Sequence, residues 1–154
     1  MQAVADRARD ELAGSLSGAA RPAIVFDIDN TSLATQYNPG VIIPAIDPIL
    51  RLAAWARGQG AAIIFVTGRP ELVNGYTRHN LTSVGFPVDG LYGSPLTTFS
   101  AGSSGLEQYK TGARIDIEFA GYTIVANIGN SPSDLTGGHA EKTYKLPDYD
   151  GALS

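Results

Sequence analysis

The sequence predicts one α/β domain, built as a parallel β-sheet with helices on both faces in a doubly wound arrangement. Short, continuous apolar runs such as residues 23–26 and 62–66 suit strands that are buried on both faces. Segments with the apolar spacing of helices alternate with these runs, which implies right-handed crossovers between parallel strands. A chain of 154 residues, 44% of them hydrophobic, fits one domain, which we expect to span residues 1–154.

The first half of the chain should begin with a helix and then enter the sheet. Apolar residues four positions apart predict an amphipathic helix within residues 1–20, at Val4, Ala8, Leu12 and Leu16. The core, residues 23–149, then opens with the first strand, residues 23–26. The next expected elements are a loop, a helix and the second strand, over residues 32–48, 49–57 and 62–66.

The second half should complete the sheet with three more strands. Pro70, placed in a first helical turn, predicts a helix over residues 71–84. The elements that follow are a short strand, a Ser/Gly-rich loop, a helix, a fourth strand and a fifth strand, over residues 88–92, 98–105, 106–119, 122–128 and 143–146.

The composition narrows the chemistry that the protein can perform. A formal charge of −4 provides no overall positive field for a nucleic acid polymer. The absence of cysteine and the presence of two histidines exclude disulfides, thiolate metal sites, cysteine nucleophiles and three-histidine metal sites. The kind of metal site that remains possible is a hard cation bound by oxygen ligands. Because no apolar run approaches the roughly 20 residues of a membrane span, and no signal-peptide pattern opens the chain, we expect a soluble protein whose compartment stays open.

Polar side chains gather just after three of the predicted strands. Asp27 and Asp29 follow the first strand, Thr67 follows the second, and Asn130 and Asp134 follow the fourth. In doubly wound sheets, ligands bind beyond the carboxyl ends of the strands. The placement of these residues therefore predicts a binding site at that edge of the sheet.

The two carboxylates after the first strand suggest a cation site. Asp27 and Asp29 are two positions apart, so they would share one face if the extended geometry continues. Two ionised carboxylates this close need a cation or hydrogen-bond donors, and Mg²⁺ prefers oxygen ligands. A plain alternative is that Asp27 and Asn30 cap a turn or a helix.

Other residues have the chemistry of a phosphate site. Thr67 offers a hydroxyl group, and Gly68 would let backbone N–H groups approach an anion at a strand-to-helix junction. A simple helix cap explains the same residues equally well, and Arg69 could be a surface charge. Lys110 could neutralise carboxylates and a phosphate dianion, although a solvated surface lysine is the commoner case. The loop of residues 129–134 could be a turn in which a serine starts a helix.

Four motifs resemble, in order and spacing, those of the haloacid dehalogenase superfamily: DIDNT at 27–31, VTGR at 66–69, Lys110, and GNxxxD at 129–134. Within it, residues 23–149 look like the small acid phosphatases of subfamily IIIB, the class B and plant vegetative-storage type. The resemblance implies a Rossmann-like core with strand order 5-4-1-2-3 and no large cap domain. It also implies magnesium-dependent hydrolysis of a small phosphate monoester through an aspartyl-phosphate.

The same resemblance assigns roles to individual residues. Asp27 would be the nucleophile and a Mg²⁺ ligand. Asp29 would protonate the leaving oxygen and then activate water, its backbone carbonyl would bind the metal, and burial beside an anionic neighbour would raise its pKa. Asn130 stands where many relatives carry a metal-binding aspartate, and Asp134 would support the metal ligands or replace Asn130. The phosphoryl group would be bound by Thr67, Gly68, Lys110, Ile28 and Asp29.

Three other functions are compatible with parts of this pattern. A response-regulator receiver domain also combines acidic residues with Thr and Lys, but its phosphoacceptor normally follows the third strand, whereas Asp27 follows the first. A binding or storage relative would be expected to lack the nucleophile. A phosphotransferase would use the same residues with an alcohol in place of water. Without a large cap, substrate specificity is expected in the loops of residues 32–48 and 92–105, and the oligomeric state stays open.

Overall fold

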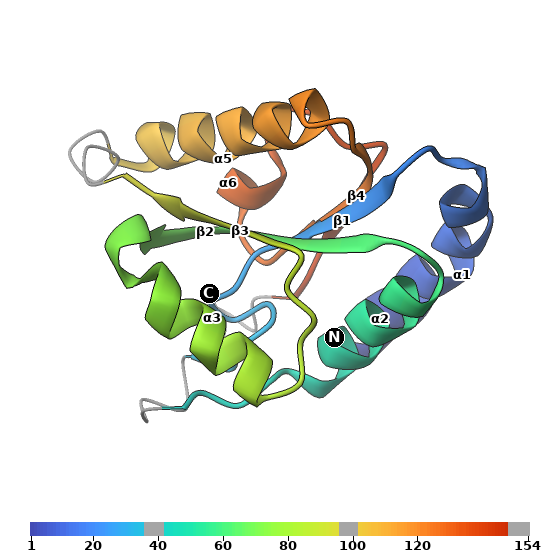
Figure 1. The fold of residues 1–154 in the computed structure, drawn as a ribbon, viewed down its shortest axis with the longest axis horizontal. Helices are drawn as coiled ribbons and strands as arrows, with labels where there is room; N and C mark the ends of the chain where they lie inside the picture. The colour runs from blue at the N-terminus through green and yellow to red at the C-terminus, as the bar shows by residue number, and fades with distance from the viewer. Residues whose placement is uncertain (36–41, 96–101, 148–154) are drawn as a thin grey trace.

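A computed structural model describes residues 1–35, 42–95 and 102–147, and Figure 1 shows the path of the chain. The described strands form one parallel sheet in the order β3-β2-β1-β4-β5. The predicted fold class and strand order are confirmed. The elements, in chain order, are α1 (Gln2–Gly18), β1 (Pro22–Phe26), α2 (Asp47–Gly58), β2 (Ala62–Pro70), η1 (Glu71–Val73), α3 (Asn74–Ser83), β3 (Gly90–Ser94), α5 (Gly102–Phe119), β4 (Thr123–Gly129), α6 (Pro132–Leu135) and β5 (Lys142–Lys145).

Helices cover both faces of the sheet, with α5 and α6 on one side and α1, α2 and α3 on the other (Figure 1). The side chains of β1 alternate between two apolar cores. Ile24 and Phe26 belong to the core that contains buried residues of α1 and α2, whereas Ala23 and Val25 pack in the core beneath α5. This alternation explains why the strand is a continuous apolar run, because neither of its faces meets water.

The second strand is longer than the sequence predicts. β2 continues to Pro70, which pairs with Ser94 of β3, and only a 3₁₀ turn follows before α3 begins at Asn74. The predicted helix start near residue 71 is therefore wrong. Because a residue before proline is restricted to extended conformations, Pro70 keeps Arg69 in the strand instead of opening a helix.

Two other element boundaries also differ from the predicted ones. β3 covers Gly90–Ser94 instead of residues 88–92, and α5 begins at Gly102, inside the segment predicted to be a loop. Serine and glycine are weak helix formers, but packing of a helix on the sheet outweighs such local preferences. The residues 36–41 and 96–101, parts of the two loops expected to carry specificity, lie outside the described residues.

The described residues contain no inserted cap domain beyond the sheet and its flanking helices. None of the helices in those ranges is long and apolar enough to cross a membrane.

Candidate active site

Side chains from β1, α5 and α6 meet beyond the carboxyl ends of the central strands. Asp27 directly follows β1, and its backbone N–H donates to the carbonyl of Ile128 in β4, 2.9 Å away. Lys110 on α5 donates to Asp27 Oδ1 over 3.2 Å and also to Asp134 Oδ1 of α6. These three charged side chains are nearly enclosed, with 8%, 4% and 4% of the surfaces of Asp27, Lys110 and Asp134 exposed. A buried lysine therefore bridges two buried carboxylates.

Burial sets the electrostatics of this cluster. Removal from water raises the pKa of Asp27 to about 7, although Lys110 opposes the shift and Asp134 adds to it. Burial lowers the pKa of Lys110, but the charges of Asp27 and Asp134 outweigh that effect and hold the pKa above its ordinary value. Lys110 is thus a permanent cation next to Asp27.

Thr31 links the first motif to the loop after β4. Its Oγ1 lies 3.2 Å from Asp27 Oδ2 and 3.3 Å from Asn130 Oδ1. The loop turns sharply to bring Thr31 there: Asn30 has a φ of 60°, and the hydroxyl of Ser32 donates to the Asp27 carbonyl over 2.8 Å. A carboxylate oxygen and an amide oxygen consequently converge on one hydroxyl group.

Asp29 has its own cation. Arg69 makes a bidentate contact with the Asp29 carboxylate, with Nη2 2.6 Å from Oδ1 and Nε 3.0 Å from Oδ2, and Thr35 also donates to Oδ1 over 2.7 Å. Burial raises the pKa of Asp29, but the hydrogen bonds and charge of Arg69, together with Thr35, lower the pKa below its usual value. The predicted upward shift is therefore wrong, because the hydrogen bonds and charge of Arg69 outweigh the effect of burial.

The VTGR residues lie in a strand and not at a helix terminus. Thr67 is buried, and its hydroxyl accepts the backbone N–H of Arg69 at 3.1 Å. A Cβ on Gly68 would lie 3.1 Å from Leu106 Cδ1, so the missing side chain leaves room for α5. The expected helix terminus is therefore absent from this segment, because β2 continues to Pro70. Ile28, also assigned to phosphate, has its side chain in the apolar core.

The short helix α6 positions Asp134, and it begins directly after a serine, as the sequence of residues 129–134 suggested. Ser131 is the residue before α6, and its backbone N–H donates to Asp134 Oδ2 over 3.0 Å. A Cβ on Gly129 would lie 2.7 Å from Asp134 Cγ, too close for any side chain. Glycine at this position therefore allows Asp134 to reach Lys110.

Among the described residues, no group of three or more His, Cys, Asp or Glu side chains could hold a metal ion by itself. A metal at this edge would need Asn130 or backbone oxygens as additional ligands. The donor set nearest Thr31, a carboxylate and an amide oxygen, fits a hard cation such as Mg²⁺, which prefers oxygen ligands and keeps several waters.

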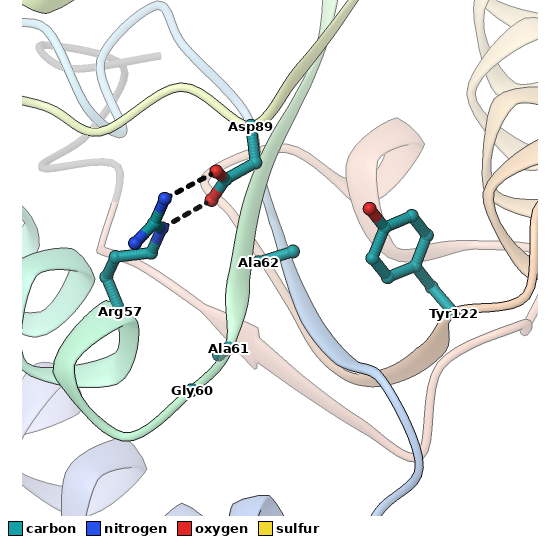
Figure 2. A pocket seen from close by; sticks show the side chains of 6 residues that line it. All are labelled: Arg57, Gly60, Ala61, Ala62, Asp89 and Tyr122. Atoms are coloured by element: carbon teal, nitrogen blue, oxygen red, sulfur yellow. Dashed lines mark hydrogen bonds and ion pairs between the residues drawn. The ribbon is translucent and has the colours of Figure 1, made fainter.

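A separate pocket of about 300 Å³ lies at the opposite edge, where the strands begin (Figure 2). Asp89 and Arg57 lie on one side of it and Tyr122 on the other. Both oxygens of Asp89 are used: Arg57 donates to them over 2.8 and 2.9 Å, and the backbone N–H of Ile63 donates to Oδ2 over 2.8 Å. None of the predicted site residues lines this pocket.

Residues 37–152 match the model of the haloacid dehalogenase (HAD) superfamily, subfamily IIIB, an acid phosphatase family. The chain belongs to this family. The matched range includes Thr67, Lys110, Asn130 and Asp134 and begins after Asp27 and Asp29. As a member of subfamily IIIB, the chain is a phosphatase, which is a hydrolase. The family implies that its substrate is a small phosphate ester. This membership confirms the resemblance and excludes a receiver domain.

Solved structures of acid phosphatases share the fold. The class C acid phosphatase from Bacillus anthracis is 17% identical, with a TM-score of 0.69, and the match covers 99% of this chain and 81% of that one. The same enzyme with tungstate bound gives 18% identity, a TM-score of 0.73 and the same coverage. A chain of the Pnkp1/Rnl/Hen1 complex is 14% identical, with a TM-score of 0.71, over 84% of this chain and 47% of that one. No curated protein matches the sequence.

Three residues around the acid phosphatase motifs were assigned no role from sequence. Thr31 contacts Asp27, Arg69 pairs with Asp29, and Arg114 donates to the backbone carbonyl of Asp134. Each had a local signal: Thr31 and Arg69 end the motifs at 27–31 and 66–69, and Arg114 follows Lys110 by four residues and so shares its face of α5.

Proposed function

We propose that this acid phosphatase hydrolyses phosphate monoesters with Mg²⁺ and through an aspartyl-phosphate on Asp27. The observation that carries the proposal is the setting of the Asp27 carboxylate. It lies beyond the end of β1 in an enclosed cluster, beside a permanently charged Lys110 and opposite the oxygen of Asn130. A nucleophilic carboxylate next to fixed positive charge suits phosphoryl transfer, in which positioning and charge stabilisation provide most of the rate.

The metal would be held by the Asp27 carboxylate, the backbone carbonyl of Asp29 and the side-chain oxygen of Asn130. Both oxygens of Asp134 already have partners, namely Lys110 and the backbone N–H of Ser131, so Asp134 would support this set instead of joining it. When bound, Mg²⁺ supplies positive charge that offsets the charge on the phosphoryl oxygens.

In the first step, Asp27 attacks phosphorus, the bond between phosphorus and the leaving oxygen breaks, and Asp29 gives that oxygen a proton. In the second step, Asp29 takes a proton from water, the water oxygen attacks phosphorus, and the bond to Asp27 breaks to release inorganic phosphate. Lys110 and Thr67 hold the phosphoryl oxygens throughout.

The Arg69–Asp29 pair places a condition on the first step. Arg69 favours the ionised form of Asp29, which suits a base but not an acid. We therefore include in the proposal that Arg69 leaves Asp29 when substrate binds and turns toward the phosphoryl group, an anion that competes for the same guanidinium. Asp29 is then free to carry the proton.

The proposal is tested by assaying a panel of phosphomonoesters before and after removal of metal with a chelator. Activity should disappear on chelation and return with Mg²⁺. Asn130→Asp should lower the Mg²⁺ concentration that gives half-maximal activity, because one more anionic oxygen would face the ion. Full activity after rigorous metal removal would contradict the role of the metal. Transfer of phosphate to an added alcohol, in preference to water, would identify a phosphotransferase instead.

A further inference from the structure

Arg114 of α5 is a buried cation that is bonded to neutral groups. Only 1% of its surface is exposed. Its guanidinium donates to the backbone carbonyl of Asp134 over 2.9 Å, to that of Gly138 over 3.0 Å, to that of Thr136, and to Thr111 Oγ1 over 3.2 Å. Taking a charge out of water is costly without a carboxylate partner, and here several charge-assisted hydrogen bonds offset the cost.

The three carbonyls belong to one segment, residues 134–138, which leaves α6 and packs against α5. Gly137 and Gly138 have φ angles of 98° and 74°, in the left-handed region that glycine adopts most readily. A Cβ on Gly137 would lie 2.9 Å from Thr111 Cγ2. The path of this segment thus depends on close contact with the helix that carries Arg114.

Hydrogen bonds fix both the main chain and the side chain of Asp134. Its backbone carbonyl accepts hydrogen bonds from Arg114 and, over 2.6 Å, from Asn127 Nδ2. Its carboxylate accepts hydrogen bonds from Lys110 and from the backbone N–H of Ser131. Lys110 and Arg114 are one helical turn apart on α5. Lys110 therefore binds the carboxylate of Asp134, while Arg114 binds its backbone carbonyl.

We infer that Arg114 is a positioning residue of the active site: it fixes the main chain of Asp134 so that the Asp134 carboxylate holds Lys110 beside Asp27. The inference rests on the proposed function, in which Lys110 binds the phosphoryl group. Within the described ranges, the guanidinium of Arg114 donates to residues 111, 134, 136 and 138 and to no side-chain atom of Asp27 or Lys110, so we place the influence of this side chain on Lys110 in the Asp134 segment.

The test combines two substitutions with a double-mutant cycle. Arg114→Met removes every side-chain donor, and Arg114→Lys keeps the charge but places its donors on one nitrogen, which cannot reach all the groups that Nε, Nη1 and Nη2 bond. Each should lower kcat/KM for a phosphomonoester by about 10- to 100-fold, the usual effect of losing a residue that supports a metal site. In an Asp134→Asn background, the same substitutions should cause little further loss, because the carboxylate through which they act is gone. Arg57→Met, which removes an arginine at the opposite edge, should leave kcat/KM unchanged.

Two further measurements separate positioning from general destabilisation. Calorimetric titration with Mg²⁺ should show weaker binding to Arg114→Lys than to Arg57→Met. A crystal structure of Arg114→Lys should show the Asp134 carboxylate displaced from Lys110. Retention of the Asp134–Lys110 contact, or a loss of activity that multiplies fully with that of Asp134→Asn, would overturn the inference. If Arg114→Met does not fold, Arg114→Lys carries the same test. If the wild-type protein hydrolyses no phosphomonoester, the proposed function fails, while the crystal structure still decides the role of Arg114.

Discussion

The two edges of the parallel sheet differ in how their carboxylates are paired with cations. At the amino edge, one arginine and one carboxylate neutralise each other in a bidentate pair (Figure 2). At the carboxyl edge, three carboxylates share two cations as ion-pair partners, because Lys110 pairs with both Asp27 and Asp134, while the buried Arg114 is hydrogen-bonded to neutral groups. The residues of that cluster are Asp27, Asp29, Asp134, Lys110 and Arg69.

This difference indicates which edge can accept a cation and a phosphate ester. Asp89 at the amino edge has both oxygens occupied, and the pair mainly ties the end of α2 to the entry of β3. Asp27 at the carboxyl edge is buried beside other acidic groups, which raises its pKa. A bound cation would relieve that unfavourable charge. The volume of a pocket is therefore a poorer guide to the active site here than the presence of buried carboxylates that share one cation.

The largest effect should come from removing the carboxylate of Asp27, which shares Lys110 with Asp134. Asp27→Asn replaces the proposed nucleophile with an amide of nearly the same shape, so turnover should fall by more than about 10⁴-fold, as when other nucleophiles are removed. The matched variant at the other edge, Asp89→Asn, should keep wild-type turnover. Steady-state assays with an aryl phosphate check both variants, and circular dichroism checks their fold. Equal turnover of Asp27→Asn and the wild type would place the active site elsewhere.

A smaller loss of activity is expected from Gly129→Ala. The added Cβ would collide with Asp134 and push its carboxylate away from Lys110, so kcat/KM should drop by about 10- to 100-fold. Gly112→Ala provides the control, because no atom lies within 4 Å of the new Cβ and alanine favours the helix. If both variants keep wild-type kcat/KM, the close approach of Asp134 is unimportant for catalysis.

The smallest effects concern stability, and the two edges should respond to pH in opposite directions. The pKa of Asp27 is raised in the folded protein to about 7, so its stabilising contribution is complete below the unfolded value near 4 and is lost as pH rises toward 7. The hydrogen bonds from Arg57 hold the pKa of Asp89 low, so its contribution is present above pH 4 and is lost as pH falls through the folded pKa.

Thermal melts of metal-free protein test this contrast. Compared with the wild type, Asp27→Asn should melt higher at pH 8 and lose that advantage at pH 4. Asp89→Asn should melt lower at pH 7, by about 2–4 °C, and approach the wild type as pH falls through the lowered pKa of Asp89. Parallel pH profiles for the two variants would contradict the proposed difference between the edges.

Much of the fold could be predicted because its signals are local. Continuous apolar runs such as residues 23–26 identify strands that are covered on both faces, and helical spacing identifies α1. The boundaries near Pro70 and Gly102 could not be predicted in the same way. Each depends on neighbours distant in sequence: Ser94 pairs with Pro70, and α5 packs on the sheet through Tyr109, Ala113 and Ile117.

The same distinction between local and distant signals applies to the candidate site. The positions of Asp27, Thr67 and Asp134 after strands indicated which edge they share. The partner of Asp29 lies 40 residues away in sequence, so the sign of its pKa shift could not be derived from its neighbours. The contacts of Arg114 depend on how residues 134–138 turn, which only the packed structure determines.

The central claim is that Asp27 accepts the phosphoryl group, and trapping the intermediate tests it most directly. In Asp29→Asn, an aryl phosphate needs little proton donation and should still phosphorylate Asp27, but no base remains to activate water, and losing such help typically costs about 10²–10⁴-fold. Quenched-flow mass spectrometry should therefore find one added phosphoryl group on the peptide that contains Asp27, and none when Asp27→Asn is added. A phosphoryl group on any other residue would contradict the account.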